Sequence, residues 1–229
     1  MMEAKSKLLD LLYPPKCVFC GKLLEPGETI CLECERQLPV TDVYSCSQGG
    51  DWFRSCVSPF FLKERVREAM HQLKFHHQEA NAVIFGRWMA RCARENFPEP
   101  FDLITWVPVS RKRRWERGFD QSRLLAKEVA RAYGSKPVRT LKKLRHTPPL
   151  SQTEGGVEVR RALVQGVYGL SFRGCLEGKR VLLVDDVITT GSTLNEASRV
   201  LREAGAAEVC CVTAARGALF SQIPLDFSK

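Results

Sequence analysis

The stretch Arg180–Leu194 reads RVLLVDDVITTGSTL, and it decides the fold of this chain. Its first five residues are an almost wholly apolar run of β-formers, as in a strand that is buried on both faces of a parallel sheet. Asp185 and Asp186 end this run, a turn rich in Thr and Gly follows, and apolar residues then recur at helical spacing until Gly205. The sequence therefore predicts a strand, an acidic pair, a hydroxyl-lined loop and a helix.

The loop of this stretch predicts a phosphate site. Unpaired backbone N–H groups at a helix N-terminus carry the positive end of the helix dipole, so residues 189–193 form a cradle for a phosphate. Asp185 and Asp186 lie at the sheet edge where open α/β folds bind ligands. Because carboxylates accept hydrogen bonds from hydroxyls, a sugar phosphate suits both features. The alternative is that the acidic pair only ends a strand and the turn only caps a helix.

The same stretch resembles the phosphoribosyl diphosphate (PRPP) signature of the type I phosphoribosyltransferases, in which a hydrophobic strand precedes Asp-Asp-x-x-x-Thr-Gly-x-Thr. Asp185, Asp186, Thr190, Gly191 and Thr193 match it position by position. The resemblance implies an α/β fold with a parallel sheet flanked by helices, and PRPP bound together with Mg²⁺. It implies catalytic roles for Asp185 and Asp186. The PRPP-binding residues that it implies are Asp185, Asp186, Val187, Thr189, Thr190, Gly191, Ser192 and Thr193.

Length and composition are those of a globular protein. With 229 residues, 44% of them apolar, the chain is long enough for one substantial α/β core and a small appendage. It has no run of about 18 apolar residues and no secretory leader, so we expect a cytoplasmic protein without a membrane partner. The net charge of +9 favours phosphorylated metabolites or nucleic acid as partners. The absence of a Walker loop and of Gly-x-Gly-x-x-Gly excludes P-loop motors and dinucleotide dehydrogenases.

Four of the ten cysteines form two Cys-x-x-Cys pairs that predict a metal site. Two such pairs on adjacent tight turns place four sulfurs at the corners of a tetrahedron, and Gly21 supplies a residue that tolerates positive φ after the first pair. A zinc ion held by four protein ligands would be structural, with no open position for catalysis. The alternative is four reduced cysteines in a small core. The predicted zinc ligands are Cys17, Cys20, Cys31 and Cys34.

A second predicted strand, Leu103–Val107, is followed by a basic segment. Residues 111–117 hold five Lys and Arg side chains in seven positions, at the sheet edge where ligands bind. Gly118 and Phe119 favour a fixed loop, although a solvated basic loop is the alternative. The position matches that of the pyrophosphate loop of a phosphoribosyltransferase, here Val109, Ser110, Arg111 and Lys112. Stacking together with phosphate contacts makes four further residues candidates for binding single-stranded DNA: Arg113, Arg114, Trp115 and Arg117.

The remaining pattern predicts alternating strands and helices. We expect residues 1–40 to form an N-terminal helix and zinc module, 41–60 a linker with a short strand near its end, and 61–229 the phosphoribosyltransferase-like domain. The predicted elements are helices at Leu8–Tyr13, Lys63–Phe75, Glu79–Glu95 and Gln121–Ala132, strands at Leu163–Leu170 and Glu208–Ala214, and a loop over Arg145–Arg161.

Taken together, these pieces resemble the ComF/GntX family of phosphoribosyltransferase-like proteins. The resemblance covers nearly the whole chain, although Asp120 and Ala162 stand where the family tends to carry Asn. It implies a zinc module on a type I phosphoribosyltransferase domain and an association with natural competence, in which imported single-stranded DNA is processed in the cytoplasm. The features that carry it are Leu11–Pro15, the cysteine pairs, Gln72–Phe75, Glu116–Phe119, Gln152–Arg161 and the PRPP stretch.

Three functions stay open at this point. The first is a Mg²⁺-dependent phosphoribosyltransferase of nucleotide metabolism, which uses PRPP or another ribose phosphate. The second is a non-catalytic competence factor whose basic surface binds single-stranded DNA. The third is a docking protein whose zinc module binds competence proteins. The sequence favours PRPP recognition over turnover, and it does not identify an acceptor.

Overall fold

The computed structural model describes residues 15–42, 46–75, 80–147 and 157–217. The helix predicted at Leu8–Tyr13 and the middle of the loop predicted at Arg145–Arg161 lie outside these residues. None of the helices in the described ranges is long and apolar enough to cross a membrane.

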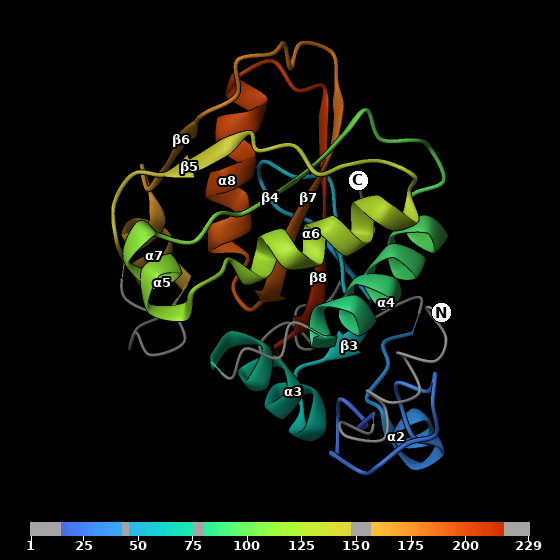
Figure 1. The fold of residues 1–229 in the computed structure, drawn as a ribbon. Helices are drawn as coiled ribbons and strands as arrows, with labels where there is room; N and C mark the ends of the chain where they lie inside the picture. The colour runs from blue at the N-terminus through green and yellow to red at the C-terminus, as the bar shows by residue number, and fades with distance from the viewer. Residues whose placement is uncertain (1–14, 43–45, 76–79, 148–156, 218–229) are drawn as a thin grey trace, which may run out of the picture.

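Strands and helices alternate through most of the chain (Figure 1). The strands are β1 (Ser47–Gln48), β2 (Cys56–Val57), β3 (Phe60–Phe61), β4 (Leu103–Trp106), β5 (Leu141–Lys143), β6 (Tyr168–Leu170), β7 (Arg180–Ile188) and β8 (Glu208–Arg216). The helices are α2 (Leu32–Gln37), α3 (Glu64–Phe75), α4 (Ala80–Asn96), α5 (Arg111–Arg117), α6 (Gln121–Ala132), α7 (Val157–Val164) and α8 (Ser192–Glu203).

The main sheet has the order β1-β2-β8-β7-β4, with β3 also paired to β8. All of its pairings are parallel except that between β1 and β2. Helices α4 and α6 cover one face, and α8 covers the other (Figure 1). The predicted parallel sheet flanked by helices is confirmed, and β5 and β6 form a separate antiparallel pair.

The two central strands are buried on both faces, as their apolar sequences predict. Along β7, Leu182 and Val184 pack on the α4 and α6 side, whereas Val181 and Leu183 pack on the α8 side. All four side chains are fully buried. This double burial fixes the register of β7 between β4 and β8, and so fixes where the acidic pair lies.

Strand β7 is longer than predicted. The sequence places its end before the acidic pair, but β7 continues to Ile188. The reason is its neighbour: β8 runs to Arg216, and Val187 and Ile188 still pair with it. Asp185 and Asp186 are therefore held by the sheet rather than by a loop.

Residues 41–60, predicted as a linker with a short strand near its end, contribute strands to the main sheet. Cys56 and Val57 pair in parallel with β8, and Phe60 pairs with Ala215 of the same strand. The short strand predicted near the end of this segment is confirmed as β2 and β3, which pair with the edge of β8, whereas β1 pairs with β2 and is too short to show a period in the sequence.

Two further elements differ from the prediction. Residues 111–117 form helix α5, not a loop, because Ser110 caps the N-terminus and Gly118 ends the helix at φ 76°. The end of the predicted loop is helix α7, and only Tyr168–Leu170 of the strand predicted at Leu163–Leu170 is a strand.

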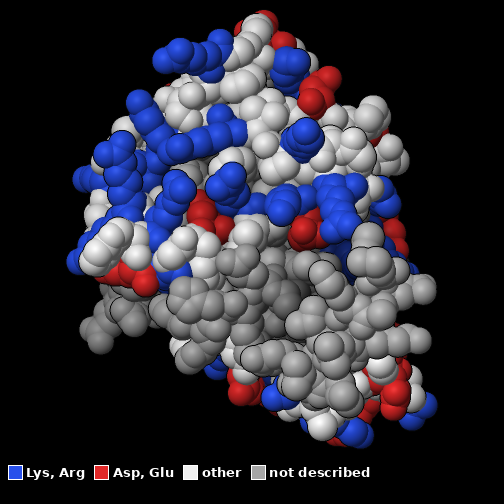
Figure 2. Space-filling view, viewed as in Figure 1, with Lys and Arg blue, Asp and Glu red and all other residues white. Residues whose placement is uncertain are grey.

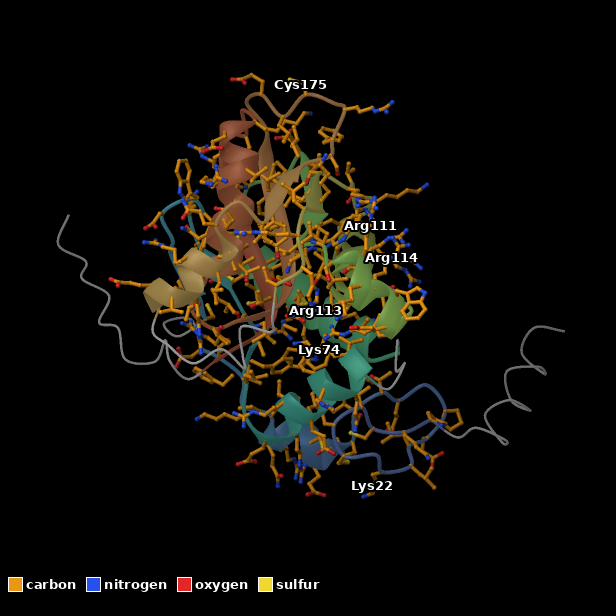
Figure 3. All side chains as sticks on the ribbon, turned by 90° about the vertical axis from the view of Figure 1, so that its left-hand side faces the viewer. Lys22, Lys74, Arg111, Arg113, Arg114 and Cys175 are labelled. Atoms are coloured by element: carbon orange, nitrogen blue, oxygen red, sulfur yellow. The ribbon has the colours of Figure 1, made fainter. Side chains whose placement is uncertain are left out.

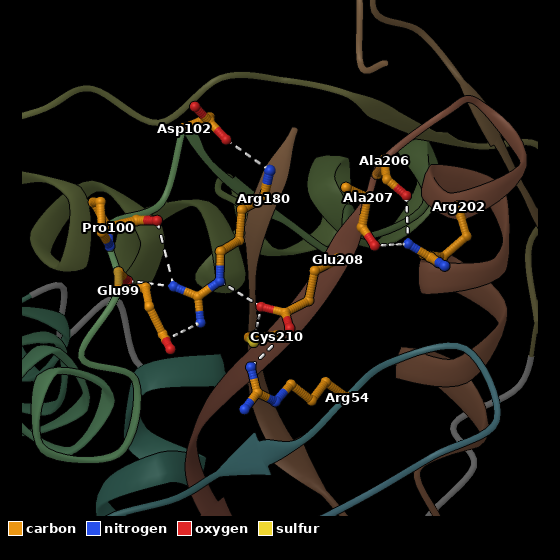
Figure 4. A network of polar contacts seen from close by, with 10 residues as sticks. All are labelled: Arg54, Glu99, Pro100, Asp102, Arg180, Arg202, Ala206, Ala207, Glu208 and Cys210. Atoms are coloured by element: carbon orange, nitrogen blue, oxygen red, sulfur yellow. Dashed lines mark hydrogen bonds and ion pairs between the residues drawn. The ribbon is translucent and has the colours of Figure 1, made fainter. Parts of the chain in front are cut away.

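An ion-pair network closes the end of the sheet opposite the predicted ligand edge (Figure 4). Arg180 pairs with Glu99 at 2.8 Å and with Glu208, and its backbone N–H donates to Asp102 Oδ2 at 2.7 Å. Arg54 adds a second pair to Glu208 at 2.9 Å. The network ties the start of β7 to the start of β8 and to the segment before β4.

Candidate functional site

The acidic pair lies where β7 meets the N-terminal turn of α6. Both carboxylates are buried, with Asp185 8% and Asp186 9% exposed. Ser122 Oγ donates to Asp185 Oδ1 at 2.9 Å, and Gln121 Nε2 donates to Asp186 Oδ2 at 3.1 Å. Lys74 of α3 forms an ion pair with Asp186 at 3.0 Å. Five side chains from three elements, β7, α6 and α3, are thus brought together.

The two carboxyl groups have opposite electrostatic settings. Burial and the neighbouring charge of Asp186 raise the pKa of Asp185. Burial also acts on Asp186, but the Lys74 charge and its hydrogen bond outweigh it and hold the pKa of Asp186 below its usual range. Asp186 is therefore the anion of the free site, and Asp185 is the carboxyl that is easily protonated.

Asp120 fixes the N-terminus of α6 against the site. Its carboxylate accepts from Arg123 N–H at 3.1 Å as the N-cap, and from Trp106 Nε1 and Val109 N–H at 3.3 Å each. One half-buried side chain thus joins β4, the predicted pyrophosphate loop and α6. Three donors suit an anionic acceptor, which explains how Asp serves at a position where the resemblance leads us to expect Asn.

The residues predicted to cradle a phosphate form the turn between β7 and α8. Gly191 precedes the helix at φ 72°, a backbone conformation that side chains with a Cβ rarely adopt. Thr190 Oγ1 and Ser192 Oγ are 2.9 Å apart, and both line a cavity of about 140 Å³. This cavity at the start of α8 is called the phosphate cup below.

A segment far away in sequence forms the other wall of the phosphate cup. Residues 48–51 and Phe53 line it, together with Arg161 and Asn195. Asn195 Nδ2 donates to Asp51 Oδ2 at 3.2 Å, and Arg161 forms an ion pair with the same carboxylate. No motif in the sequence predicts a role for this wall. The glycine pair at 49–50, next to a carboxylate, was its only signal.

The predicted pyrophosphate loop borders a second and larger cavity. Ser110 caps α5 by accepting from Arg113 N–H at 3.3 Å, and its Oγ lies 2.8 Å from His146 Nδ1. The cavity has a volume of about 560 Å³, within the range of small-molecule sites. It is called the basic pocket below. Its lining residues are Val109, Ser110, Arg111, Lys112, Arg139, Lys142, Lys143, Leu144, Arg145, His146 and Ser171.

Lys143 of β5 is the least exposed cation of the basic pocket. Burial and the nearby charge of Arg113 lower the pKa of Lys143 to about 8. Its Nζ lies 5.3 Å from the centre of the Tyr168 ring. Figure 2 shows Lys and Arg side chains gathered over α5 and β5. A desolvated lysine among other cations is stabilised by a bound anion, because the anion favours the charged form of the lysine.

The four candidates for DNA contact divide into two pairs. Arg114 and Trp115 are exposed, and Trp115 is 87% exposed. Arg113 is half-buried and donates to the Thr147 carbonyl at 2.9 Å. Arg117 is also half-buried, and its Nη1 donates to the Gln121 side chain at 3.0 Å. Arg117 thus bonds a residue of the acidic site, Arg113 bonds the segment after β5, and the outer pair faces solvent.

The two cysteine pairs come together as predicted. The Sγ atoms of Cys17, Cys20, Cys31 and Cys34 all lie within 4.8 Å of one another. Zinc bound to four thiolates at about 2.3 Å separates their sulfurs by about 3.8 Å, so the cluster fits structural zinc. Gly21 has φ 73°, and its N–H donates to the Cys17 carbonyl at 2.8 Å, as the knuckle turn requires.

Several residues of the site carry no local signal in the sequence. Lys74 belongs to a segment that carries the family resemblance, but nothing in the sequence predicts its ion pair with Asp186. Gln121 and Ser122 read as an ordinary helix start, although they bind the acidic pair. Their roles follow from the packing of α3 and α6 on β7, which no short motif encodes.

Comparison with known proteins finds a matching family for the sheet domain and another for the cysteine module. Residues 120–219 match the family described as "Phosphoribosyl transferase domain", and residues 8–61 match "Double zinc ribbon domain". "DNA utilization protein YhgH" of Salmonella typhi is 28% identical over 200 residues, which are 84% of this chain and 86% of that protein.

Two competence proteins are similar over the same extent. "Competence protein F" of Haemophilus influenzae is 28% identical over 206 residues, 85% of this chain and 82% of its own. "Competence protein ComFC" of Bacillus subtilis is 25% identical over 207 residues, 81% of this chain and 82% of its own. Because the likeness runs through the ribbon and the sheet domain alike, the chain is a homologue of these competence and DNA utilization proteins, and it joins a double zinc ribbon to a phosphoribosyltransferase-like domain.

Proposed function

We propose that this chain recognises PRPP together with Mg²⁺ at the edge of β7, and that it does so in the handling of transforming DNA. One observation carries the proposal: the acidic pair, the phosphate cup and the basic pocket's loop lie at the carboxyl ends of two adjacent parallel strands. A sugar that carries phosphate at one end and pyrophosphate at the other suits these three sites in that order.

Each part of PRPP has a matching group. The N-terminus of α8 suits the 5-phosphate, because its backbone N–H groups and the hydroxyls of Thr190 and Ser192 are donors. Asp185 and Asp186 suit the ribose hydroxyls. In the described part of the chain, both hydrogen bonds that Asp185 accepts fall on Oδ1, which leaves Oδ2 for a ligand.

The basic pocket suits the pyrophosphate. Arg111, Lys112 and Lys143 are cations beside the predicted pyrophosphate loop, and they would stabilise the charge of a phosphoanhydride. Bound Mg²⁺ would shield the same charge. The relatives' names, which refer to DNA utilization and competence, support a role next to transforming DNA. The proposal concerns recognition of PRPP, and an acceptor is not part of it.

Calorimetric titration of the wild-type protein with PRPP in Mg²⁺ tests the proposal. We expect one binding site per chain, with weaker binding of ribose 5-phosphate because that ligand leaves the basic pocket empty. Absence of binding by both ligands would contradict PRPP recognition. Release of pyrophosphate in the presence of nucleobases or nucleosides would extend it to the active phosphoribosyltransferase.

Replacing Lys143 by Met is expected to weaken PRPP binding about 10-fold at pH 7 and to leave ribose 5-phosphate binding unchanged. A hydrogen bond to a charged group contributes about 1.5–3 kcal/mol, and only the pyrophosphate reaches this lysine. Because the pKa of Lys143 is about 8, its charge is lost as pH rises through that value. The ratio of wild-type to variant affinity should therefore shrink between pH 7 and pH 9.

Lys127→Met is the matched control for this experiment. Lys127 lies exposed on α6, outside the basic pocket, and the substitution removes the same charge. Equal weakening by the two variants would mean that net charge alone attracts PRPP. Equal weakening of both ligands by Lys143→Met would remove the assignment of pyrophosphate to the basic pocket.

A second candidate function, binding of single-stranded DNA, is favoured by the exposure of Trp115 at 87% next to Arg114. Stacking on an aromatic ring contributes about 1–3 kcal/mol per base, so Trp115→Ala should weaken oligonucleotide binding about 5- to 150-fold. With about five phosphate contacts, the log-log salt slope is expected near −3.5. Fluorescence anisotropy over a salt series measures both values.

Arg114→Ala and Arg91→Ala supply the comparison for DNA binding. Arg114→Ala should make the salt slope shallower by about 0.7, because one phosphate contact is lost. Arg91 lies exposed on α4, and its replacement should leave the slope unchanged. A flat salt response, or equal effects of both variants, would argue against DNA binding by α5.

A further inference from the structure

We propose that helix α3 couples the zinc ribbon to the PRPP site, with Arg65 as a positioning residue for Lys74. The inference rests on the proposed function, because it concerns the affinity of the acidic pair for its ligand. Arg65 lies at the first turn of α3 and contacts the cysteine cluster, whereas Lys74 lies at the last turn and contacts Asp186. One helix of 12 residues thus touches both sites.

The N-terminal end of α3 is bound to the ribbon by charge. Arg65 Nη1 lies 3.0 Å from Cys34 Sγ, and Nη2 lies 3.3 Å from Glu33 Oε1. Four thiolates around one zinc ion carry a net negative charge, so a guanidinium beside them is stabilising. Cys34 is fully buried, which makes this contact stronger than a surface ion pair.

The C-terminal end of α3 is bound to the acidic pair. Lys74 Nζ lies 3.0 Å from Asp186 Oδ2, and the two side chains are only 25% and 13% exposed. In Figure 3, Lys74 on α3 lies between the ribbon, marked by Lys22, and helix α5. This contact places the charge of Lys74 directly on a buried carboxylate of the site. The position of α3 therefore sets the electrostatics of the ribose-binding carboxylates.

The body of α3 is held rigidly between these two ends. Val66, Ala69, Met70 and Leu73 are all at most 2% exposed. Rigid packing of this kind transmits a shift at one end to the other, because a close-packed core does not deform locally. A displacement of Arg65 would thus move Lys74 as well.

The ribbon also shares its apolar core with the sheet domain. Phe19, which lies between the first two cysteines, packs edge-on against Phe60 of β3 at 6.1 Å and Phe85 of α4 at 5.8 Å between ring centroids. Phe19 is 2% exposed. Loss of zinc would free the ribbon and withdraw this ring from its contacts with β3 and α4.

The backbone conformation at the start of α3 also supports a link between this helix and the ribbon. Glu64 has φ 33°, a left-handed conformation that costs about 1–3 kcal/mol in a residue with a side chain. Such a conformation persists only where its surroundings hold it, and the adjacent Arg65 is anchored on Cys34 and Glu33. The ribbon contacts therefore hold the helix start in a conformation that α3 would not adopt alone.

The proposal is tested by reciprocal linkage between zinc and PRPP. We expect the zinc-free protein, prepared with a chelator, to bind PRPP about 10-fold more weakly than the zinc-loaded protein. By thermodynamic necessity, saturating PRPP should then raise the zinc affinity by the same factor, measured by competition with a chromophoric chelator. Both readouts are equilibrium affinities and require no turnover.

Arg65→Met separates coupling from unfolding of the ribbon. All four cysteines remain, so at saturating zinc the variant keeps a folded ribbon. It should still bind PRPP about 3- to 10-fold more weakly than wild type. Arg67→Met is the matched control, because Arg67 is exposed on the same helix and bonds only the Leu62 carbonyl in the described residues. Its PRPP affinity should equal that of wild type.

A double variant identifies the route of the effect. In a Lys74→Met background, adding Arg65→Met should cause no further loss of PRPP affinity, because the residue through which Arg65 acts is gone. An additive loss would overturn the assignment of Arg65 as a positioning residue for Lys74.

PRPP affinity that is equal with and without zinc would overturn the coupling and leave PRPP recognition intact. Failure of the zinc-loaded wild type to bind PRPP would overturn both the proposed function and the coupling built on it.

Discussion

Replacing Asp185 and Asp186 together by Asn is expected to weaken PRPP binding about 150- to 25,000-fold. Each carboxylate is assigned to a ribose hydroxyl, and a hydrogen bond to a charged group contributes about 1.5–3 kcal/mol, so two such losses give this range. Asn is nearly isosteric, and Ser122 can still donate to its side-chain oxygen. The loss should therefore come from the missing charge and not from a change of shape.

The single replacement Asp185→Asn should at the same time stabilise the fold. Burial and the Asp186 charge raise the pKa of Asp185, so the folded state binds this proton more tightly than the unfolded state does. Stability is then lost as pH rises toward the raised pKa, and the full cost is present above it. Asn carries no charge to bury, so the gain in Tm over wild type should be larger at pH 8 than at pH 6.

Asp102→Asn serves as the control for both measurements. Asp102 lies at the opposite end of the sheet, where it accepts the Arg180 backbone N–H, and its side chain is exposed. Calorimetry should find unchanged PRPP affinity in this variant. PRPP affinity that survives in the double variant would remove the acidic pair from the ligand site. A fall in Tm for Asp185→Asn would show that its ionised form stabilises the fold.

Cys34→Ser is expected to abolish zinc retention and to lower Tm by about 10 °C or more. Structural zinc sites in small modules bind with about 10–16 kcal/mol, comparable to the entire stability of a domain, and a three-thiolate remnant loses much of that. Cys34 is fully buried in the core that also holds Phe19 and Phe60, so the loss reaches the sheet domain. Zinc content of the purified protein and thermal unfolding measure the two effects.

Cys175→Ser provides the matched control for the zinc prediction. Cys175 is an exposed thiol, and Figure 3 shows it at the end of the molecule remote from the ribbon. Its replacement should leave one zinc per chain and an unchanged Tm. Full zinc content and an unchanged Tm in Cys34→Ser would mean that the cluster holds no structural metal.

Much of the fold follows from short-range sequence pattern. Helix α6 has the predicted bounds Gln121–Ala132, and α3, α4 and α8 match their predictions to within a few residues. These helices have strong apolar periodicity and clear ends, so local preference and tertiary packing agree. The bounds predicted for the zinc module and the sheet domain, residues 1–40 and 61–229, remain predictions.

The secondary-structure predictions are wrong where tertiary contacts decide the structure. The sequence of helix α5 predicts a basic loop because its five Lys and Arg residues dominate the pattern and the capping residues do not stand out. Only the backbone geometry of Ser110 and Gly118 shows that the segment is a helix. Strand β1 has two residues, too few for a period to show, and it exists because the edge of β2 offers unpaired backbone groups that must be satisfied.

The sequence of Arg180–Leu194 by itself determined the kind of site this protein has. An apolar strand, two carboxylates and a Thr-Gly turn imply their own geometry, because strand, turn and helix are set by neighbouring residues. Tertiary structure alone decided what surrounds that site. Lys74, Ser122 and Asp51 lie from about 60 to 140 positions away from the residues that they contact or face, and only the packing of α3, α6 and residues 48–53 around β7 and α8 brings them there.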